Sequence, residues 1–217
     1  MKLYGASASP YVRKTLAFAA EKGVELELVP AGLGGGPPEF MRASPFGKMP
    51  AFQDGDFLIS DSTAIITYID AVKPEPNLIP LEPRARARTI WFEEFADTIL
   101  IGCMGKMFFN RFVAPRVLGR EGDLVAADAA EAQELPPLLD YLESQIPDSG
   151  FLVEDRLTLA DLAVASPFQN LALIGIRPDK ARHPRIAAFV AAVLGRPSFA
   201  RWCEEEFKTF GPAPEPA

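Results

Sequence analysis

The sequence predicts a two-part fold, with an α/β unit over residues 1–72 and an all-helical unit over 84–217. Strand and helix patterns alternate in the first part, whereas the second part shows helical patterns throughout. Between them, at 73–83, the segment "KPEPNLIPLEP" has four prolines in eleven residues. That composition is typical of a linker without regular structure.

The α/β unit begins with a short strand and a complete helix. "MKLYG" at residues 1–5 has the apolar character of a central strand. The next pattern is a helix over 9–23. Ser9 suits its N-cap, Pro10 its first helical position and Gly23 its C-terminal stop.

The rest of this unit predicts a second strand, a hairpin and a closing helix. "VELELV" at 24–29 alternates apolar and acidic residues, as a half-buried strand does. After a Gly/Pro-rich loop and a short helical piece, 49–60 holds two apolar runs around Asp54-Gly55, a strong hairpin signal. Residues 61–72 then carry isoleucines at helical spacing. A parallel pair joined by a helix and followed by a hairpin predicts a mixed four-stranded sheet with helices on both faces.

Helical patterns fill the second half of the chain. The segment with Pro136 and Pro137 is expected to bend or break at these prolines. Thr158 and Asp161 have the spacing of a capping box at a helix start. The predicted helices cover 84–113, 123–146, 157–175, 183–197 and 198–210.

The composition argues against several classes of function. A net charge of −7 disfavours a nucleic-acid or anionic-membrane partner. No apolar run reaches the roughly 18 residues of a membrane span, and the first residues lack the apolar region of a signal peptide. We therefore expect a cytoplasmic protein. Cys103, Cys203 and His183 are the only soft metal ligands and have no metal-ligand spacing, so no metal site is predicted.

Four short motifs point to one family. In chain order they are "SPYVRK", "SPFGKMP", "SDSTAIITYI" and "LTLADLAVA". Combined with the α/β half, the linker and the helical half, they resemble the cytosolic glutathione S-transferase family, in particular its serine-type, bacterial-like members. The resemblance covers essentially the whole chain. It implies a thioredoxin-like fold for 1–72, glutathione as co-substrate, a role in detoxification and a homodimer.

The resemblance gives Ser9 a role besides capping the helix. Serine-type members carry here the hydroxyl that hydrogen-bonds the glutathione sulfur. The thiol of glutathione has a pKa near that of free cysteine, roughly 8.5, and only the thiolate is the nucleophile. A hydrogen bond to a charged group is worth about 1.5–3 kcal/mol, which corresponds to about one to two pKa units. Ser7, Tyr11 and Tyr4 are the rival hydroxyls.

The other motifs imply residues that would hold glutathione. Met49-Pro50 resembles the family's cis-proline step, where the residue before proline pairs its backbone with the cysteinyl unit. Asp61 would bind the γ-glutamyl ammonium, and Ser62 its carboxylate at a helix N-terminus. The chain has "LGGGPP" where many relatives carry basic or polar side chains. Lys48 and Arg13 are therefore the candidates for the glycyl end.

The resemblance also places a pocket for a small hydrophobic electrophile between the two halves. Within this pocket, Arg111 would favour an anionic group. Phe46 resembles the aromatic key that some family dimers insert into the partner, which implies a two-fold interface. The candidates for the pocket are Tyr11, Trp91, Phe95, Phe108, Arg111 and Phe112.

Two classes of function remain open at this point. The first is an enzyme in which Ser9 assists attack of the glutathione thiolate on an electrophile, with alkyl or aryl transfer as the main reading and lyase, dehalogenase or isomerase steps as variants. The second is a non-catalytic binding or interaction module on the same fold. The presence of Ser9, Pro50, Asp61 and Ser62 favours the enzyme, because a scaffold needs no peptide site.

Overall fold

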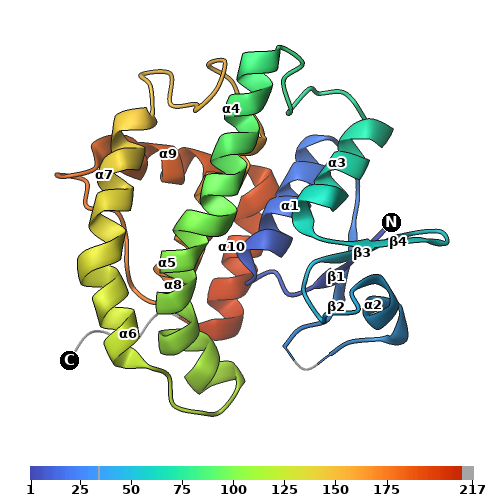
Figure 1. Ribbon diagram of the computed structural model, residues 1–217, viewed down its shortest axis with the longest axis horizontal. Helices are drawn as coiled ribbons and strands as arrows, with labels where there is room; N and C mark the ends of the chain where they lie inside the picture. The colour runs from blue at the N-terminus through green and yellow to red at the C-terminus, as the bar shows by residue number, and fades with distance from the viewer. Residues whose placement is uncertain (34, 212–217) are drawn as a thin grey trace.

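The computed structural model describes residues 1–33 and 35–211 (Figure 1). Residue 34 and residues 212–217, which end the predicted helical half, lie outside this range. A four-stranded sheet with its helices lies beside a larger group of helices, so the predicted fold class is confirmed. Among the described residues, no helix is both long and apolar enough to cross a membrane.

The sheet has the predicted mixed topology. Its strand order is β2-β1-β3-β4; β1 and β2 run parallel, whereas β1–β3 and β3–β4 are antiparallel. Leu3 and Phe52 pack with the helices on one face, and Tyr4 and Ala51 pack with Phe40 of α2 on the other. The elements are β1 Lys2–Gly5, α1 Pro10–Glu21, β2 Glu27–Pro30, α2 Pro38–Ala43, β3 Ala51–Asp54, β4 Phe57–Ser60 and α3 Ser62–Val72.

The second strand is shorter than predicted, because it begins at Glu27 instead of Val24. Gly23 takes the left-handed conformation, with φ of 69°, and ends the helix as expected. The N–H of Val24 still donates to the carbonyl oxygen of Ala19 at 2.8 Å. Residue 24 therefore belongs to the helix cap, and the sheet pairing can start only after it.

The helical half is interrupted by π-helical segments. The helix predicted over 84–113 runs on to Val117 but passes through two such segments, η1 and η2. Pro136 and Pro137 lie in the first turn of α7 directly after η3, so the predicted interruption is present. The elements are α4 Pro83–Glu94, η1 Phe95–Leu100, α5 Ile101–Phe108, η2 Phe109–Val117, α6 Leu124–Ala129, η3 Ala130–Glu134, α7 Leu135–Gln145, α8 Leu159–Leu173, α9 Pro184–Leu194 and α10 Pro197–Phe210.

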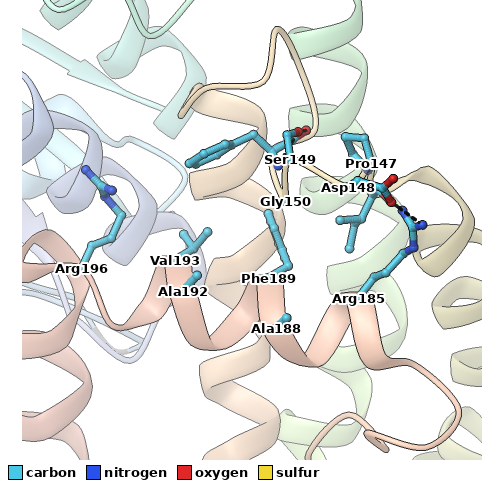
Figure 2. Close-up of a pocket in the computed structure, with 12 residues that line it drawn as sticks. Pro147, Asp148, Ser149, Gly150, Arg185, Ala188, Phe189, Ala192, Val193 and Arg196 are labelled. Atoms are coloured by element: carbon cyan, nitrogen blue, oxygen red, sulfur yellow. Dashed lines mark hydrogen bonds and ion pairs between the residues drawn. The ribbon is translucent and has the colours of Figure 1, made fainter.

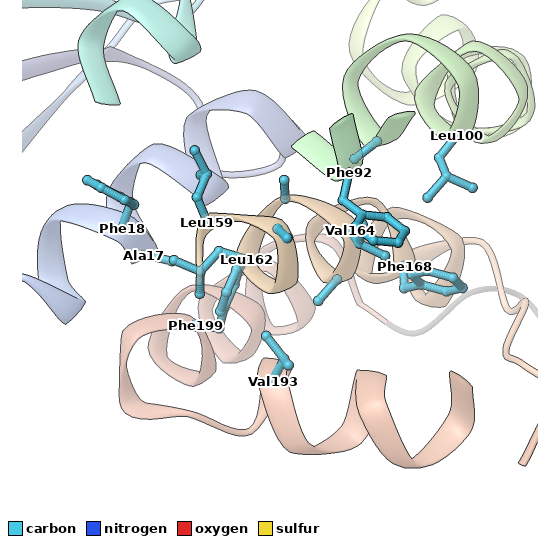
Figure 3. Packing of buried hydrophobic residues seen from close by; sticks show 14 of the residues in the cluster. Ala17, Phe18, Phe92, Leu100, Leu159, Leu162, Val164, Phe168, Val193 and Phe199 are labelled. Carbon is cyan, nitrogen blue, oxygen red and sulfur yellow. The ribbon is translucent and has the colours of Figure 1, made fainter. Parts of the chain in front are cut away.

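Helix α8 is the centre of the core and is buried along its whole length. Its side chains, among them Leu162 and Phe168, meet α4 on one side and α9 and α10 on another (Figure 3). Ala17 and Phe18 of α1 belong to the same cluster. One continuous apolar core therefore joins the α/β unit to the helical unit.

The segment between α3 and α4 contains no helix or strand, but it is held against α1. Lys22 is 1% exposed and pairs with Asp70 at 2.6 Å. Its ammonium also donates to three main-chain carbonyl oxygens, those of Lys73, Pro74 and Pro76, at 2.8 to 2.9 Å. This buried lysine ties the proline-rich segment to the end of α1.

The capping box at the start of α8 is formed as predicted, so replacing Asp161 by alanine should destabilise the protein strongly. Asp161 accepts the N–H groups of Leu152 at 2.8 Å and Thr158 at 2.7 Å, and all three residues are buried. Two buried donors left without an acceptor cost about 1–3 kcal/mol each. Asp123→Ala is the matched control, since Asp123 caps α6 on the surface and its loss should cost only about 1 kcal/mol. Urea unfolding followed by circular dichroism checks this; equal losses for the two variants would contradict it.

Candidate active site

The sheet topology brings three separate sequence motifs to one edge. The loop with Ser9 follows β1, Met49-Pro50 directly precedes β3, and Asp61 directly follows β4. Because β3 is antiparallel to both of its neighbours, these three strand ends lie side by side at the same edge. The N–H of Asp61 donates to the carbonyl oxygen of Pro50 at 3.3 Å. Helices α1 and α3 both begin at this edge (Figure 1).

Gly5 allows the first turn of α1 to approach the end of β1. A Cβ atom at this position would lie 2.5 Å from Cγ2 of Val12 and 3.6 Å from Cβ of Met49. The first distance is too short for any side chain, so only glycine permits this packing. The start of α1 is thereby held next to Met49.

Ser9 occupies the N-cap position, but its hydroxyl does not cap the helix. Its backbone is extended, and Pro10 takes the first helical position as predicted. The hydroxyl accepts no N–H from the first turn and makes no other hydrogen bond within the described part of the chain. The capping role is thus corrected: the half-buried hydroxyl of Ser9 is available at the positive end of α1.

Two of the rival hydroxyls are already engaged. Tyr4 is 2% exposed, packs on the α2 face and donates to Gln53. Tyr11 donates to the main-chain oxygen of Asp97 at 2.9 Å. Burial, followed by the charge of Asp97, raises the pKa of Tyr11 to about 12. Ser7 remains an alternative, since it is half-buried and has no hydrogen bond among the described residues.

The turn before α3 offers polar groups to a ligand. Asp61 caps α3 through Oδ1, which accepts the N–H groups of Thr63 at 2.9 Å and Ala64 at 3.1 Å. Its other carboxylate oxygen makes no hydrogen bond to a described residue, and the side chain is exposed. The neighbouring Ser62 is 3% exposed, and its hydroxyl has no partner in the described part of the molecule. Capping therefore leaves one oxygen of Asp61 and the hydroxyl of Ser62 for other contacts.

The segment before β3 presents unpaired backbone groups. The Met49-Pro50 bond is cis, as predicted. The N–H and C=O of Met49 make no hydrogen bond with any described residue. Lys48 is exposed, and its ammonium forms no ion pair within 1–33 and 35–211. The main-chain groups of Met49 are therefore free to pair with an added strand, and the cationic Lys48 is the neighbouring residue.

A buried ion cluster that the sequence did not reveal lies between α1, α3 and α4. Lys14 is 1% exposed and pairs with Glu93 and Asp97, both at 2.5 Å. Thr63, next to the Asp61 turn, donates its hydroxyl to Glu93 at 2.6 Å. No local pattern signals this cluster, because its members are far apart in the sequence. It links the start of α3 to the helical half.

The cluster holds two carboxylates but only one ammonium. One oxygen of Glu93 and one of Asp97 are buried without a hydrogen-bond partner among the described residues. Burial raises the pKa of Asp97 to about 6, although Lys14 opposes the shift. Asp97 therefore binds its proton more tightly in the folded protein than in the unfolded chain.

Arg13 is not available to glutathione, which corrects its prediction. The side chain is fully buried between α1, α8 and α10. Its Nε and Nη2 donate to the two oxygens of Glu206, both at 3.0 Å. Its Nη1 donates to the carbonyl oxygen of Ser166 at 2.7 Å and to Oδ1 of Asn170 at 3.1 Å. Arg13 joins α1 to α8 and α10.

Two predicted pocket residues, Trp91 and Phe95, face α7 and not α1, which corrects their prediction. The indole of Trp91 donates to the hydroxyl of Tyr141 on α7 at 3.3 Å, and Phe95 meets Tyr141 edge-on with ring centroids 5.3 Å apart. Glu93 and Asp97, which face α1, lie on the opposite side of this helix. Trp91 and Phe95 therefore pack α4 against α7.

Arg111 also points away from α1, which corrects the expected pocket cation. Its guanidinium pairs with Asp128 at 2.7 Å and with Glu131 at 2.5 Å. Both partners belong to the α6–η3 segment at the outer side of the helical half. Two carboxylates neutralise this arginine, so it offers no free charge to a substrate.

Phe108 and Phe112 form a small separate cluster near the end of α8. Their rings stack with centroids 4.7 Å apart and pack with Leu173, close to Phe207 and Phe210 of α10. Arg116 and Arg177, which sequence reasoning missed, lie over this cluster, at 5.2 Å from the ring of Phe112 and 5.9 Å from that of Phe207. Leu173 of this cluster is three residues beyond Asn170 on α8, and the Asn170 amide donates to the carbonyl oxygen of Ala8 in the Ser9 loop.

A pocket of about 370 Å³ lies elsewhere, between α9 and the loop 146–151 (Figure 2). Ala188 and Ala192 line it, with an arginine toward each end. Arg185 pairs with Asp148 at 2.6 Å, and Arg196 pairs with Glu21 at 2.8 Å. Both cations are already neutralised, and none of the predicted ligand-binding residues reaches this pocket.

The raised pKa of Asp97 predicts how Asp97→Asn changes stability with pH. Because the folded pKa of about 6 exceeds the ordinary 3.8, the stability contributed by the bound proton is full below pH 3.8 and is lost as pH rises through 6. Asparagine mimics the protonated form at every pH. Between about pH 4 and pH 7, we expect the free energy of unfolding of the variant to rise relative to that of the wild type by up to about 3 kcal/mol. Urea unfolding across this range measures the difference, and a constant difference would contradict it.

Comparisons with known proteins agree on one family. The family models described as "Glutathione S-transferase, N-terminal domain" and "Glutathione S-transferase, C-terminal domain" match residues 3–77 and 121–206. A glutathione S-transferase of Hyoscyamus muticus is 32% identical, covering 94% of this chain and 98% of that protein; glutathione S-transferase 3 of Zea mays is 30% identical, covering 93% and 92%. The crystal structure of a glutathione S-transferase from Rhodospirillum rubrum has a TM-score of 0.88 at 26% identity, covering 99% and 96%. The resemblance to the family is confirmed, and the chain belongs to the glutathione S-transferase family.

Proposed function

We propose that this protein transfers alkyl or aryl groups to glutathione, and that the hydroxyl of Ser9 stabilises the thiolate that attacks a small hydrophobic electrophile. The observation that carries the proposal is the unengaged hydroxyl of Ser9 at the N-terminus of α1. This hydroxyl donates a hydrogen bond to the glutathione sulfur and retains its own proton. The thiol proton leaves to solvent, the sulfur bonds to the electrophilic carbon, and the leaving group departs with its electron pair.

The energies are sufficient for a useful effect. A hydrogen bond to the charged sulfur, worth about 1.5–3 kcal/mol, lowers the thiol pKa from roughly 8.5 to roughly 6.5–7.5. The positive end of α1 contributes about 0.3–1 kcal/mol more. At neutral pH the thiolate fraction then rises by about tenfold.

The sheet edge would bind the peptide part of glutathione. The unpaired N–H and C=O of Met49 suit antiparallel pairing with the cysteinyl unit. The free oxygen of Asp61 suits the γ-glutamyl ammonium, and the hydroxyl of Ser62 with the N-terminus of α3 suits its carboxylate. Lys48 is the remaining candidate for the glycyl carboxylate, since Arg13 is buried.

The electrophile would lie between the Ser9 loop and the cluster at the end of α8. Tyr11 would line it from α1, and the buried, stacked pair Phe108 and Phe112 would lie behind it on the apolar side. Arg116 and Arg177 are exposed at this cluster and favour an electrophile that carries or develops negative charge.

We also infer a homodimer in the cytoplasm. Phe46 is 90% exposed on the loop after α2, more than any other large apolar side chain in the described part of the chain. Insertion into the helical half of a second copy would remove it from water. The cytoplasmic location stays a prediction.

Replacing Ser9 by alanine should raise the pKa of the bound glutathione thiol by about one unit or more, because the donor to the sulfur is lost. The pH dependence of the ultraviolet absorption of bound thiolate measures this directly. Ser7→Ala is the matched control, since Ser7 is the other serine of this loop and is also half-buried.

Each outcome of this titration decides between stated alternatives. Equal pKa values in Ser9→Ala and the wild type would remove Ser9 from the mechanism, and a shift in Ser7→Ala alone would assign the role to Ser7. No glutathione binding by the folded wild type would favour a non-catalytic module instead.

Replacing Phe46 by serine should convert the dimer to a monomer at micromolar concentration, because the buried aromatic anchor is lost. Light scattering coupled to size-exclusion chromatography gives the mass. Phe57→Ser is the control: Phe57 is also exposed, at 40%, but stacks on Tyr68 of its own chain. A dimeric Phe46→Ser variant, or a monomeric wild type, would refute this role of Phe46.

A further inference from the structure

We propose that Asn170 and Ser166 of α8 are positioning residues that hold the loop of Ser9 in place through hydrogen bonds to its main chain. Asn170 Nδ2 donates to the carbonyl oxygen of Ala8 at 2.7 Å, and Ser166 Oγ donates to that of Pro10 at 2.8 Å. These two carbonyls belong to the residues directly before and after Ser9. The inference rests on the proposed function, because it assigns to these residues the placement of the reacting hydroxyl.

Both donors are buried and therefore in fixed positions. Asn170 is 3% exposed and Ser166 is 1% exposed. They lie four residues apart and so project from the same face of α8, one turn apart. The two hydrogen bonds therefore form a pair of supports that matches the spacing of the two carbonyls.

A buried ion pair sets the direction of the Asn170 amide. Arg13 Nη1 donates to Oδ1 of Asn170 at 3.1 Å, so the carbonyl end of the amide must face Arg13. The amino end is then directed at Ala8. Arg13 itself is held by both oxygens of Glu206, which is 1% exposed. A chain of buried contacts thus runs from α10 through α1 and α8 to the Ser9 loop.

Ser9 depends on these supports because its own side chain has none. Its hydroxyl makes no hydrogen bond among the described residues, so its place is set by the main chain alone. Within the loop, the N–H of Ser9 donates to the carbonyl oxygen of Ala6 at 2.9 Å. A shift of the loop would change the distance from the hydroxyl to the glutathione sulfur, and misplacement by about 1 Å can lower a rate by about 100-fold.

The neighbouring Gln169 provides a matched control for a purely structural role. It is also a buried amide on α8, 3% exposed, but its Nε2 donates to the carbonyl oxygen of Cys203 on α10 at 3.4 Å. Asn170→Leu and Gln169→Met each replace a buried amide by an apolar side chain of similar size. Both should lower stability, yet only the first removes a contact to the Ser9 loop.

The first measurement is the pKa of the bound glutathione thiol, from its ultraviolet absorption, in both variants of the full-length protein. We expect Asn170→Leu to raise this pKa by about one unit, a roughly tenfold smaller thiolate fraction near neutral pH. Gln169→Met should leave it within a few tenths of the wild-type value. An unchanged pKa in folded Asn170→Leu, or equal shifts in both variants, would overturn the proposal.

A second measurement is independent of glutathione. Amide hydrogen exchange of the peptide covering residues 6–13 reports directly on the loop. It should become at least several-fold faster in Asn170→Leu and stay unchanged in Gln169→Met. If the wild type failed to form thiolate, the proposed function would be refuted, but the exchange measurement would still decide whether Asn170 holds the loop. Unchanged exchange over residues 6–13 in Asn170→Leu would overturn that claim.

Ser166→Ala covers the case in which Asn170→Leu does not fold. It deletes one oxygen and so removes the donor to Pro10 with little change in volume. We expect a smaller increase of the thiol pKa in the same direction, together with faster exchange over residues 6–13. A folded Ser166→Ala variant that matches the wild type in both measurements would contradict the support from Ser166.

Discussion

The structure depends on two adjacent cations of α1, Arg13 and Lys14, that are buried where the two halves meet. Arg13 pairs with Glu206 of α10, and Lys14 pairs with Glu93 and Asp97 of the long helix after the linker. A buried charge without its partner costs roughly 3–5 kcal/mol. The halves can therefore associate only in the orientation that brings these carboxylates to α1. Apolar burial around α8 drives the association, and the ion pairs select its geometry.

This constraint determines how the site is assembled. Helix α1 carries Ser9 at its start and both buried cations within its first two turns. Fixing α1 against the helical half therefore also fixes Ser9 relative to α8. The sheet edge supplies the groups suited to a peptide, at Met49 and the Asp61 turn. Ser9 and the groups proposed to bind the peptide thus belong to the α/β unit, whereas side chains of the helical unit donate hydrogen bonds to the loop of Ser9.

Elements whose signals are local formed as predicted. The first helix, the hairpin and the capping box at Asp161 all depend on residues within a few positions of one another, whereas the cis bond before Pro50 was implied by the family resemblance. Predictions were wrong where helical periodicity had to identify a neighbour. Trp91 and Arg111 lie on helices as predicted, but they face α7 and α6 instead of α1. Periodicity shows that a face is apolar or charged, and it does not show which element packs against that face.

By itself, the sequence determined the order of elements, the mixed sheet, the family motifs and the residues available at the sheet edge, because turns, caps and alternation act over short distances. Only the tertiary structure decided that Arg13 is a buried structural cation and that the hydroxyl of Ser9 is free of the helix cap. It alone brought Asn170 to the loop beside Ser9, across 162 positions of the chain. Such contacts leave no local pattern, since they arise from the way the core around α8 packs the two halves together.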